Sequence, residues 1–436
     1  MRTSNKTVSV LFVILFVSLS MHAQTLNTDS IYRYFSSRAN YLENAIPDYS
    51  LPDPLMMSDG EPVNNLSDWN EKRRPELLRL FEREMFGQAP ERPKNMNFKV
   101  LKEDKDALGG LATRKEIAVY LTPDDKHYFT ILLYVPNNRS GAVPLFFGLN
   151  FKGNHAVSND PGISYPSLEK QKEFRWKKLP PRGVAADRWP IEMLMDNGYA
   201  LATVYRGDID PDFDDDFKNG VHPLFYRRGQ TRPGDYEWGT IAAWAWSMSC
   251  AMDYFETDRD INASQVAVLG HSRLGKAALW AGAVDQRFAI VISNCSGCGG
   301  AAISRRAVGE TVNAINSQFP HWFCRNFKKY NDKEAMLPFD QHELIALIAP
   351  RPVYIASATE DKWADPKGEF LSGVYATPVY EKIFNRKGLD SEMPKADTPM
   401  QEGYIAYHIR SGEHDITLYD WKQYVIFANK WFKKNK

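Results

Sequence analysis

The sequence predicts an α/β fold, a three-layer sandwich in which helices cover both faces of a mostly parallel central sheet. The first observation behind this prediction is that short apolar segments alternate with longer helical stretches after residue 140. The second is a pair of earlier apolar runs, separated by "PDDKH", which predict an antiparallel hairpin leading into the parallel strands. With 436 residues, 43% of them hydrophobic, the chain is long enough to bury a large core.

The elements are expected in the following order. A helix should run from Ser67-Asp68, an N-cap signal, to Gly87, a stop signal, because apolar residues between them recur at helical spacing, and it should cover one edge of the fold. The hairpin is expected at 112–122 and 128–137. Parallel strands should follow at 143–150, 199–207, 265–270, 288–294 and 351–358, with helices such as 237–255 and 275–284 between them.

An antiparallel entry followed by parallel β-α units is typical of the α/β-hydrolase fold. We therefore expect a signal peptide at 1–23, an N-terminal lead-in with its covering helix at 24–95, and an α/β-hydrolase catalytic domain at 96–436.

The signal peptide is predicted from Arg2 and Lys6, which precede an apolar run and then Met21-His22-Ala23, an imperfect match to a small-residue cleavage site, with the cut after Ala23. A membrane anchor is the alternative, but the run is shorter than the ~20 apolar residues that span a bilayer. We therefore expect an exported protein, periplasmic or secreted, with no membrane contact once the signal is removed. Lys plus Arg equals Asp plus Glu at 54 each, so no basic surface argues for a nucleic-acid partner.

Neither a metal nor a cofactor is expected. Four cysteines are too few for a disulfide scaffold, and Cys295-x-x-Cys298 without further ligands is a weak zinc signal. Buried thiols or one local bridge are both compatible with this pair. The acidic run 208–216 lacks the glycine and the glutamate of an EF-hand loop, so it is expected to be solvated or to stabilise its own loop.

The candidate nucleophile is Ser272 in "GHSRLGK", where a buried strand turns into a helix. A strained turn in this context lifts a serine hydroxyl above the sheet, although the second glycine comes one residue later than in G-x-S-x-G. A serine that only caps the helix is the alternative.

Chain order selects the partners of this serine, because α/β-hydrolase triads run Ser, then acid, then His. His414 lies in the loop "SGEHD", while the second choice, His408, lies within an alternating strand. Asp361 follows the strand 351–358 and is the preferred acid, with Glu360 and Asp365 as alternatives.

With these residues the chain resembles the glucuronoyl esterases of carbohydrate esterase family 15, whose bacterial members often carry G-H-S-R-x-G-K. Further matches are "GLNFKGNH" (148–155), "YRGDIDPDF" (205–213), "SGCGGAAISRR" (296–306) and the closing "SGEHD" with "YDW". The resemblance implies that Ser272 is the nucleophile, that His414 is the base, and that Arg273 contributes to the oxyanion hole. It also implies that the sugar is bound by Lys276, Glu310, Gln318 and Trp363.

The implied reaction is hydrolysis of esters that join (4-O-methyl-)glucuronate side chains of xylan to lignin alcohols, with glucuronoxylan or another uronate ester as the partner. One departure bears on it: Cys295 stands where many members carry the triad glutamate, and a neutral thiol cannot balance an imidazolium. Asp361 is expected to supply the acid from the loop after the next strand. An acetyl xylan esterase and a carbohydrate-binding pseudoenzyme are the alternatives.

Overall fold

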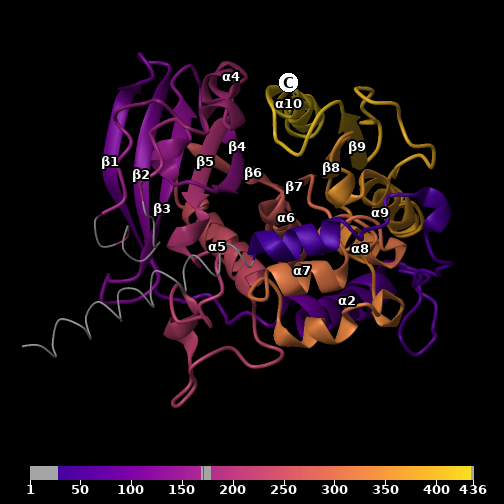
Figure 1. Cartoon of the computed structure of the whole chain (residues 1–436). Helices are drawn as coiled ribbons and strands as arrows, with labels where there is room; N and C mark the ends of the chain where they lie inside the picture. The colour runs from indigo at the N-terminus through magenta and orange to yellow at the C-terminus, as the bar shows by residue number, and fades with distance from the viewer. Residues whose placement is uncertain (1–27, 168–169, 171–177, 434–436) are drawn as a thin grey trace, which may run out of the picture.

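The computed structural model describes residues 28–167, 170 and 178–433 (Figure 1), so the predicted signal peptide at 1–23 lies outside the described residues. The predicted α/β fold is confirmed. Its sheet has nine strands in the order β1-β2-β3-β5-β4-β6-β7-β8-β9. The strands β1 (Asn97–Ala107), β2 (Ala112–Tyr120) and β3 (Tyr128–Pro136) are antiparallel, and β3 also pairs antiparallel with β5.

The other neighbouring strands pair in parallel, as the alternation of apolar segments and helices predicted. They are β4 (Val143–Asn150), β5 (Ala200–Tyr205), β6 (Ile261–His271), β7 (Ile290–Asn294), β8 (Val353–Ala358) and β9 (Ile405–Arg410). Every predicted strand is therefore present. Sequence analysis missed β1, because most of its side chains are exposed and charged and give no apolar pattern.

Helices cover both faces of the sheet (Figure 1). One face packs against α4 (Ile191–Asp196) and α10 (Leu418–Phe432) in one apolar cluster. The opposite face packs against α5 (Thr240–Phe255), α6 (Arg273–Val284), α8 (Gln341–Ala346) and α9 (Pro366–Pro378) in a second, larger cluster, and α7 (Val312–Gln318) lies further out. Among the described residues, no helix is long and apolar enough to cross a bilayer.

The predicted covering helix is confirmed as a continuous helical segment made of η2 (Asp68–Arg73), α2 (Arg74–Phe81) and η3 (Glu82–Phe86). It ends before Gly87, whose φ of 82° is a left-handed value that glycine adopts without strain. The helix begins two residues earlier than predicted: Ser67 is already helical, and Asn65 Oδ1 accepts the Asp68 N–H at 3.0 Å instead. Asn and Ser are similarly favoured at the N-cap, so residue type alone could not distinguish Asn65 from Ser67 as the start of the helix.

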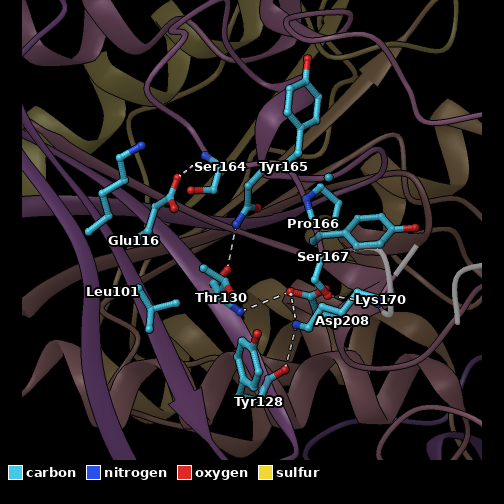
Figure 2. A pocket seen from close by; sticks show the side chains of 14 residues that line it. Leu101, Glu116, Tyr128, Thr130, Ser164, Tyr165, Pro166, Ser167, Lys170 and Asp208 are labelled. Atoms are coloured by element: carbon cyan, nitrogen blue, oxygen red, sulfur yellow. Dashed lines mark hydrogen bonds and ion pairs between the residues drawn. The ribbon is translucent and has the colours of Figure 1, made fainter. Parts of the chain in front are cut away.

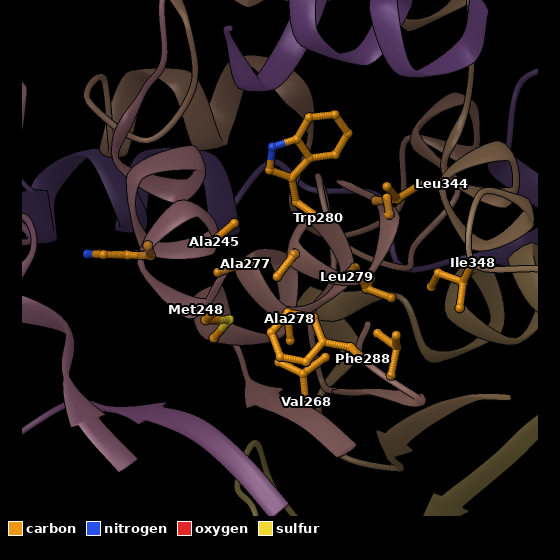
Figure 3. Packing of buried hydrophobic residues seen from close by; sticks show 14 of the residues in the cluster. Ala245, Met248, Val268, Ala277, Ala278, Leu279, Trp280, Phe288, Leu344 and Ile348 are labelled. Atoms are coloured by element: carbon orange, nitrogen blue, oxygen red, sulfur yellow. The ribbon is translucent and has the colours of Figure 1, made fainter. Parts of the chain in front are cut away.

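This segment packs on the outer side of α6. The ring of Phe86 stacks on Trp280 of α6 at a centroid distance of 4.4 Å, and Phe81 stacks on Phe339 at 4.0 Å. Figure 3 shows side chains of α6 packed among side chains from α5, β6 and the 344–348 segment. Because α6 begins directly after Ser272, this packing fixes the position of the candidate nucleophile.

We expect Trp280→Ala to lower the free energy of unfolding by about 3–5 kcal/mol, because the side chain is fully packed and its removal leaves a cavity. Urea unfolding followed by circular dichroism measures the change. Met336→Ala, at an exposed side chain, is the control and should change stability by less than about 0.5 kcal/mol. Equal effects of the two substitutions would contradict the packing of α6 described above.

Candidate active site

Ser272 lies in a strained turn at the junction of β6 and α6. Its backbone has φ 57° and ψ −130°, which is an unfavourable conformation for a residue with a side chain. Its N–H donates to the carbonyl of Asn294 at 2.8 Å, which ties the turn to the end of β7. Its side chain makes no capping hydrogen bond to the helix, so the capping alternative has no support in the structure. The turn has the geometry of a nucleophile elbow.

The displaced glycine of "GHSRLGK" has a structural reason. A Cβ atom on Gly270 would overlap the carbonyl of Leu274, and one on Gly275 would lie 3.0 Å from both Gly270 O and Ser296 Cβ. The first turn of α6 therefore passes close to β6 at Gly270, and Gly275 brings it close to the turn after β7. Position 274 is the buried core contact and carries Leu274, so here the glycine is needed at 275.

His414 is oriented by Asp361. The Nδ1 atom of His414 lies 2.6 Å from Asp361 Oδ2, and the histidine side chain is 43% exposed while the aspartate side chain is 6% exposed. An imidazole whose Nδ1–H is held by a carboxylate presents Nε2 to the pocket as a base. A backbone hydrogen bond holds the loop of Asp361 against the loop of His414, because the Glu360 N–H donates to the carbonyl of Gly412 at 2.9 Å.

The alternative candidates serve other purposes. His408 is fully buried on β9, with Nε2 2.9 Å from Asp420 and Nδ1 2.9 Å from the hydroxyl of Tyr354. Asp365 caps α9 and pairs with Arg306 at 2.7 Å. Of the three acidic candidates, Asp361 is the one that the structure places against His414.

Cys295 lies beside this pair. Its Sγ, a carboxylate oxygen of Asp361 and a ring nitrogen of His414 are all within 4.8 Å of one another. Burial raises the pKa of the Cys295 thiol well above its ordinary value, and the nearby Glu369 and Asp361 raise it further. The thiol is therefore neutral at physiological pH and cannot stabilise an imidazolium. All four cysteines are free thiols, so the Cys295–Cys298 bridge left open by the sequence is absent.

Arg273 is held over two aromatic rings by Asp212. Its Nη1 donates to Asp212 Oδ2 at 2.5 Å, and the guanidinium carbon lies 5.0 Å from the ring centre of Phe319 and 4.6 Å from that of Trp322. Burial alone would raise the pKa of Asp212, but Arg206 and Arg273 lower it well below its usual value. A charged, buried carboxylate thus fixes the cation next to the serine.

Asp212 belongs to the acidic run 208–216, which sequence analysis expected only to be solvated or to stabilise its loop. It also accepts hydrogen bonds from His321 Nε2 at 3.1 Å and from Trp322 Nε1 at 2.7 Å. The run is loop-stabilising, as predicted, but its role at the site was missed. Nothing in the pattern of alternating aspartates distinguished the one that reaches Arg273.

The eight residues singled out by the sequence all line one pocket of about 280 Å³ at the carboxyl ends of the parallel strands. Lys276 Nζ donates to the carbonyl of Ser296 at 2.5 Å and lies 3.9 Å from Glu310 Oε2. Burial lowers the pKa of Lys276 and raises the pKa of Glu310, while their mutual attraction opposes both shifts. The backbone N–H of Glu310 donates to the carbonyl of Trp363 at 2.9 Å, and Gln318 lies at the end of α7.

Tyr32 also lines this pocket and was not predicted. It comes from helical residues 28–36 of the lead-in, and its ring meets that of Trp363 edge-on at 5.3 Å. The lead-in is fastened nearby by Glu43, which pairs with Arg306 at 2.6 Å and with Lys367 at 2.7 Å. A tyrosine in a polar segment carries no signal for a pocket in the sequence, since only the tertiary fold brings it there.

The fold and this pocket define an α/β-hydrolase, with its site where such sheets bind ligands. A family model described as "Glucuronyl esterase, fungi" matches residues 224–383. Carbohydrate esterase MZ0003, from an unknown prokaryotic organism, is 51% identical over 397 residues, which cover 89% of this chain and 91% of that protein. A 4-O-methyl-glucuronoyl methylesterase from Wolfiporia cocos is 28% identical over 78% of this chain and 74% of its own length.

Solved structures agree. A promiscuous esterase of carbohydrate esterase family 15, from a marine bacterial metagenome, has a TM-score of 0.82 at 51% identity and covers 90% of this chain and 99% of its own. A glucuronoyl esterase from Solibacter usitatus has a TM-score of 0.84 at 47% identity, and the match covers 89% of this chain and 100% of that chain. The chain belongs to carbohydrate esterase family 15, the glucuronoyl esterases, and is a carboxylic ester hydrolase.

Beneath the pocket, the buried carboxyl of Glu369 predicts a pH-dependent stability. Burial raises its pKa from 4.5 to about 8, against hydrogen bonds from Ser357 and Gly297. Between these two values the folded chain binds more protons at this group than the unfolded chain, so stability should fall as the pH rises from about 5 to 8. Glu369→Gln should reduce that fall, measured as melting temperature against pH. The same substitution at exposed Glu402 is the control, and a slope that Glu369→Gln leaves unchanged would contradict the assignment.

Proposed function

We propose that this protein is a serine esterase that hydrolyses esters between (4-O-methyl-)glucuronate side chains of xylan and lignin alcohols. The observation that carries the proposal is the 2.6 Å contact between His414 and Asp361 in the pocket that Ser272 also lines. These three residues have the chain order and the loop positions of an α/β-hydrolase triad. Relatives named 4-O-methyl-glucuronoyl methylesterases support a uronate ester as the substrate class.

In the first step, His414 Nε2 takes the hydroxyl proton of Ser272, and Oγ attacks the C6 carbonyl carbon of the uronate ester. The negative charge that develops on the carbonyl oxygen is stabilised by the N–H of Arg273 and by its guanidinium. His414 then gives the proton to the departing alcohol, which leaves an acyl-enzyme. Asp361 keeps Nδ1 protonated and balances the charge of the imidazolium in between.

In the second step, His414 removes a proton from water, and the resulting nucleophile attacks the acyl carbon. The ester bond to Ser272 breaks, the hydroxyl regains its proton from the imidazolium, and free uronate leaves. Every proton in this cycle moves through His414, so neither a metal nor a cofactor takes part in the proposed mechanism.

The remaining pocket residues suit a uronate as the acyl group. Lys276 and Glu310 together offer a donor and an acceptor for sugar hydroxyls, with Gln318 beside them. Trp363 offers an aromatic wall for a sugar ring. A bare acetate would leave these groups without partners on the acyl part of the substrate, so their presence in the pocket of Ser272 favours a uronate ester over the acetyl xylan esterase alternative.

The pseudoenzyme alternative was motivated by Cys295, and the Asp361–His414 contact argues against it. A carboxylate reaches the base from the loop after β8, so the neutral thiol after β7 leaves no gap in the triad. For a protein that acts on plant cell-wall polymers, the predicted export to the periplasm or medium is the expected location.

Ser272→Ala should abolish the release of alcohol from benzyl glucuronate, because it removes the attacking atom. Wild-type enzyme should hydrolyse this ester and leave an acetylated xylo-oligosaccharide intact. Ser264→Ala, at an exposed position near the other end of the same strand, is the control for folding and should retain full activity. Turnover of the acetate alone would identify a xylan deacetylase, and activity in Ser272→Ala would show that another group is the nucleophile.

Asp212→Asn should lower kcat for benzyl glucuronate about 10²-fold, since the guanidinium of Arg273 loses its charged anchor and small displacements cost that much. KM should change less than kcat, because the loss falls on the developing oxyanion. Asp216→Asn, at an exposed position of the same acidic run, should leave both parameters unchanged. A folded Asp212→Asn enzyme with normal kcat would remove Arg273 from the proposed mechanism.

A further inference from the structure

A second pocket, of about 330 Å³, lies beside the antiparallel strands (Figure 2). We call it the ribbon pocket. The residues used in the argument are Glu116 on β2, Tyr128 and Thr130 on β3, Asn154 after β4, Lys170, and Asp208 after β5. None of them lines the pocket around Ser272. The proposed mechanism gives this cavity no role.

Glu116 brings a buried carboxylate to the wall of this pocket. The residue is 4% exposed, its Oε1 accepts the Ser164 N–H at 2.6 Å, and no described residue forms an ion pair with it. A buried carboxylate is costly unless its oxygens are hydrogen-bonded. Among the described residues the Ser164 N–H is the one donor to this carboxylate, so a ligand hydroxyl in the pocket would add a second hydrogen bond.

The charges in the ribbon pocket are balanced. Lys170 Nζ lies 3.3 Å from Asp208 Oδ2 and donates to the carbonyl of Tyr128 at 3.1 Å, and Asp208 also accepts the Thr130 N–H at 3.2 Å (Figure 2). A strongly anionic ligand would meet two carboxylates, and a cation would meet two lysines, Lys102 and Lys170. A neutral ligand with many hydroxyl groups suits this mixture of acceptors and donors.

The ribbon pocket and the candidate active site both lie at the end of the sheet where the parallel strands have their carboxyl ends. Tyr205 and Asp208 line it just beyond the carboxyl end of β5, which lies two strands from β6 and so about 10 Å away at ordinary strand spacing. The same loop continues to Asp212, which holds Arg273. One chain segment therefore joins the two pockets.

We propose that the ribbon pocket binds neutral sugar units of the polysaccharide whose uronate ester is cleaved at Ser272. The choice of xylan as that polysaccharide rests on the proposed function, whereas the polyol chemistry rests on Glu116, Asp208 and their surroundings. Glu116 and Asp208 accept hydrogen bonds from sugar hydroxyls, and the Asn154 side chain is the amide at the same wall. The pocket is thus a binding subsite remote from the reacting bond.

The test is titration of neutral xylotetraose, which carries no ester, into Ser272→Ala enzyme by calorimetry. Adding Glu116→Gln should weaken binding about tenfold or more, as expected for the loss of charged hydrogen-bond acceptors in a buried site. Glu103→Gln on the exposed strand β1 is the matched control and should bind as the parent does. A crystal structure of the Ser272→Ala complex should show the sugar against Glu116.

Absence of measurable binding by the parent, equal affinity after Glu116→Gln, or sugar found only beside residue 272 would each overturn the proposal. Should Glu116→Gln fail to fold, Thr130→Val and the crystal structure provide the same comparison. Failure of the proposed function is a separate outcome: it would appear as absent hydrolysis of benzyl glucuronate by wild-type enzyme, which does not depend on the ribbon pocket.

Discussion

The contact between His414 and Asp361 is the interaction on which the proposed chemistry depends. It joins the loops after β8 and β9, which backbone hydrogen bonds already hold together, and it directs the free ring nitrogen toward the pocket of Ser272. In the proposed mechanism the acid comes from the loop after β8, and Cys295 follows β7. Cys295 beside Asp361 and His414 is a buried thiol whose raised pKa keeps it neutral, so it does not compete with Asp361 for the imidazole.

The two cations next to the serine in the sequence, Arg273 and Lys276, are each held by a buried hydrogen-bond acceptor. Arg273 is held by Asp212 and Lys276 by the carbonyl of Ser296. Two cations in the first turn of α6 oppose the helix dipole, so their presence indicates a use outside the helix. In the proposed mechanism a developing oxyanion and a polar, acid-derived substrate provide that use.

Most of the architecture could be predicted from the sequence, because buried parallel strands and an amphipathic covering helix have strong patterns. The exposed strand β1 could not, since its charged residues follow no apolar alternation. At the site, motif and chain order led to Ser272, His414 and Asp361, the family resemblance led to the other predicted residues, and the fold gathers all of them into one pocket. Tyr32 and Asp212 were missed because each depends on a tertiary contact, with Trp363 and with Arg273, that no local pattern records.

The most direct test of the triad is kcat for benzyl glucuronate in Asp361→Asn, with Cys295→Ala measured beside it. If Asp361 is the triad acid, Asp361→Asn should lose about 10⁴-fold in kcat because the imidazole adopts the wrong tautomer. Cys295→Ala should stay within a few-fold of wild type, since its thiol carries no charge. A folded Asp361→Asn enzyme that keeps kcat within about tenfold of wild type would contradict the assignment and move the acid elsewhere.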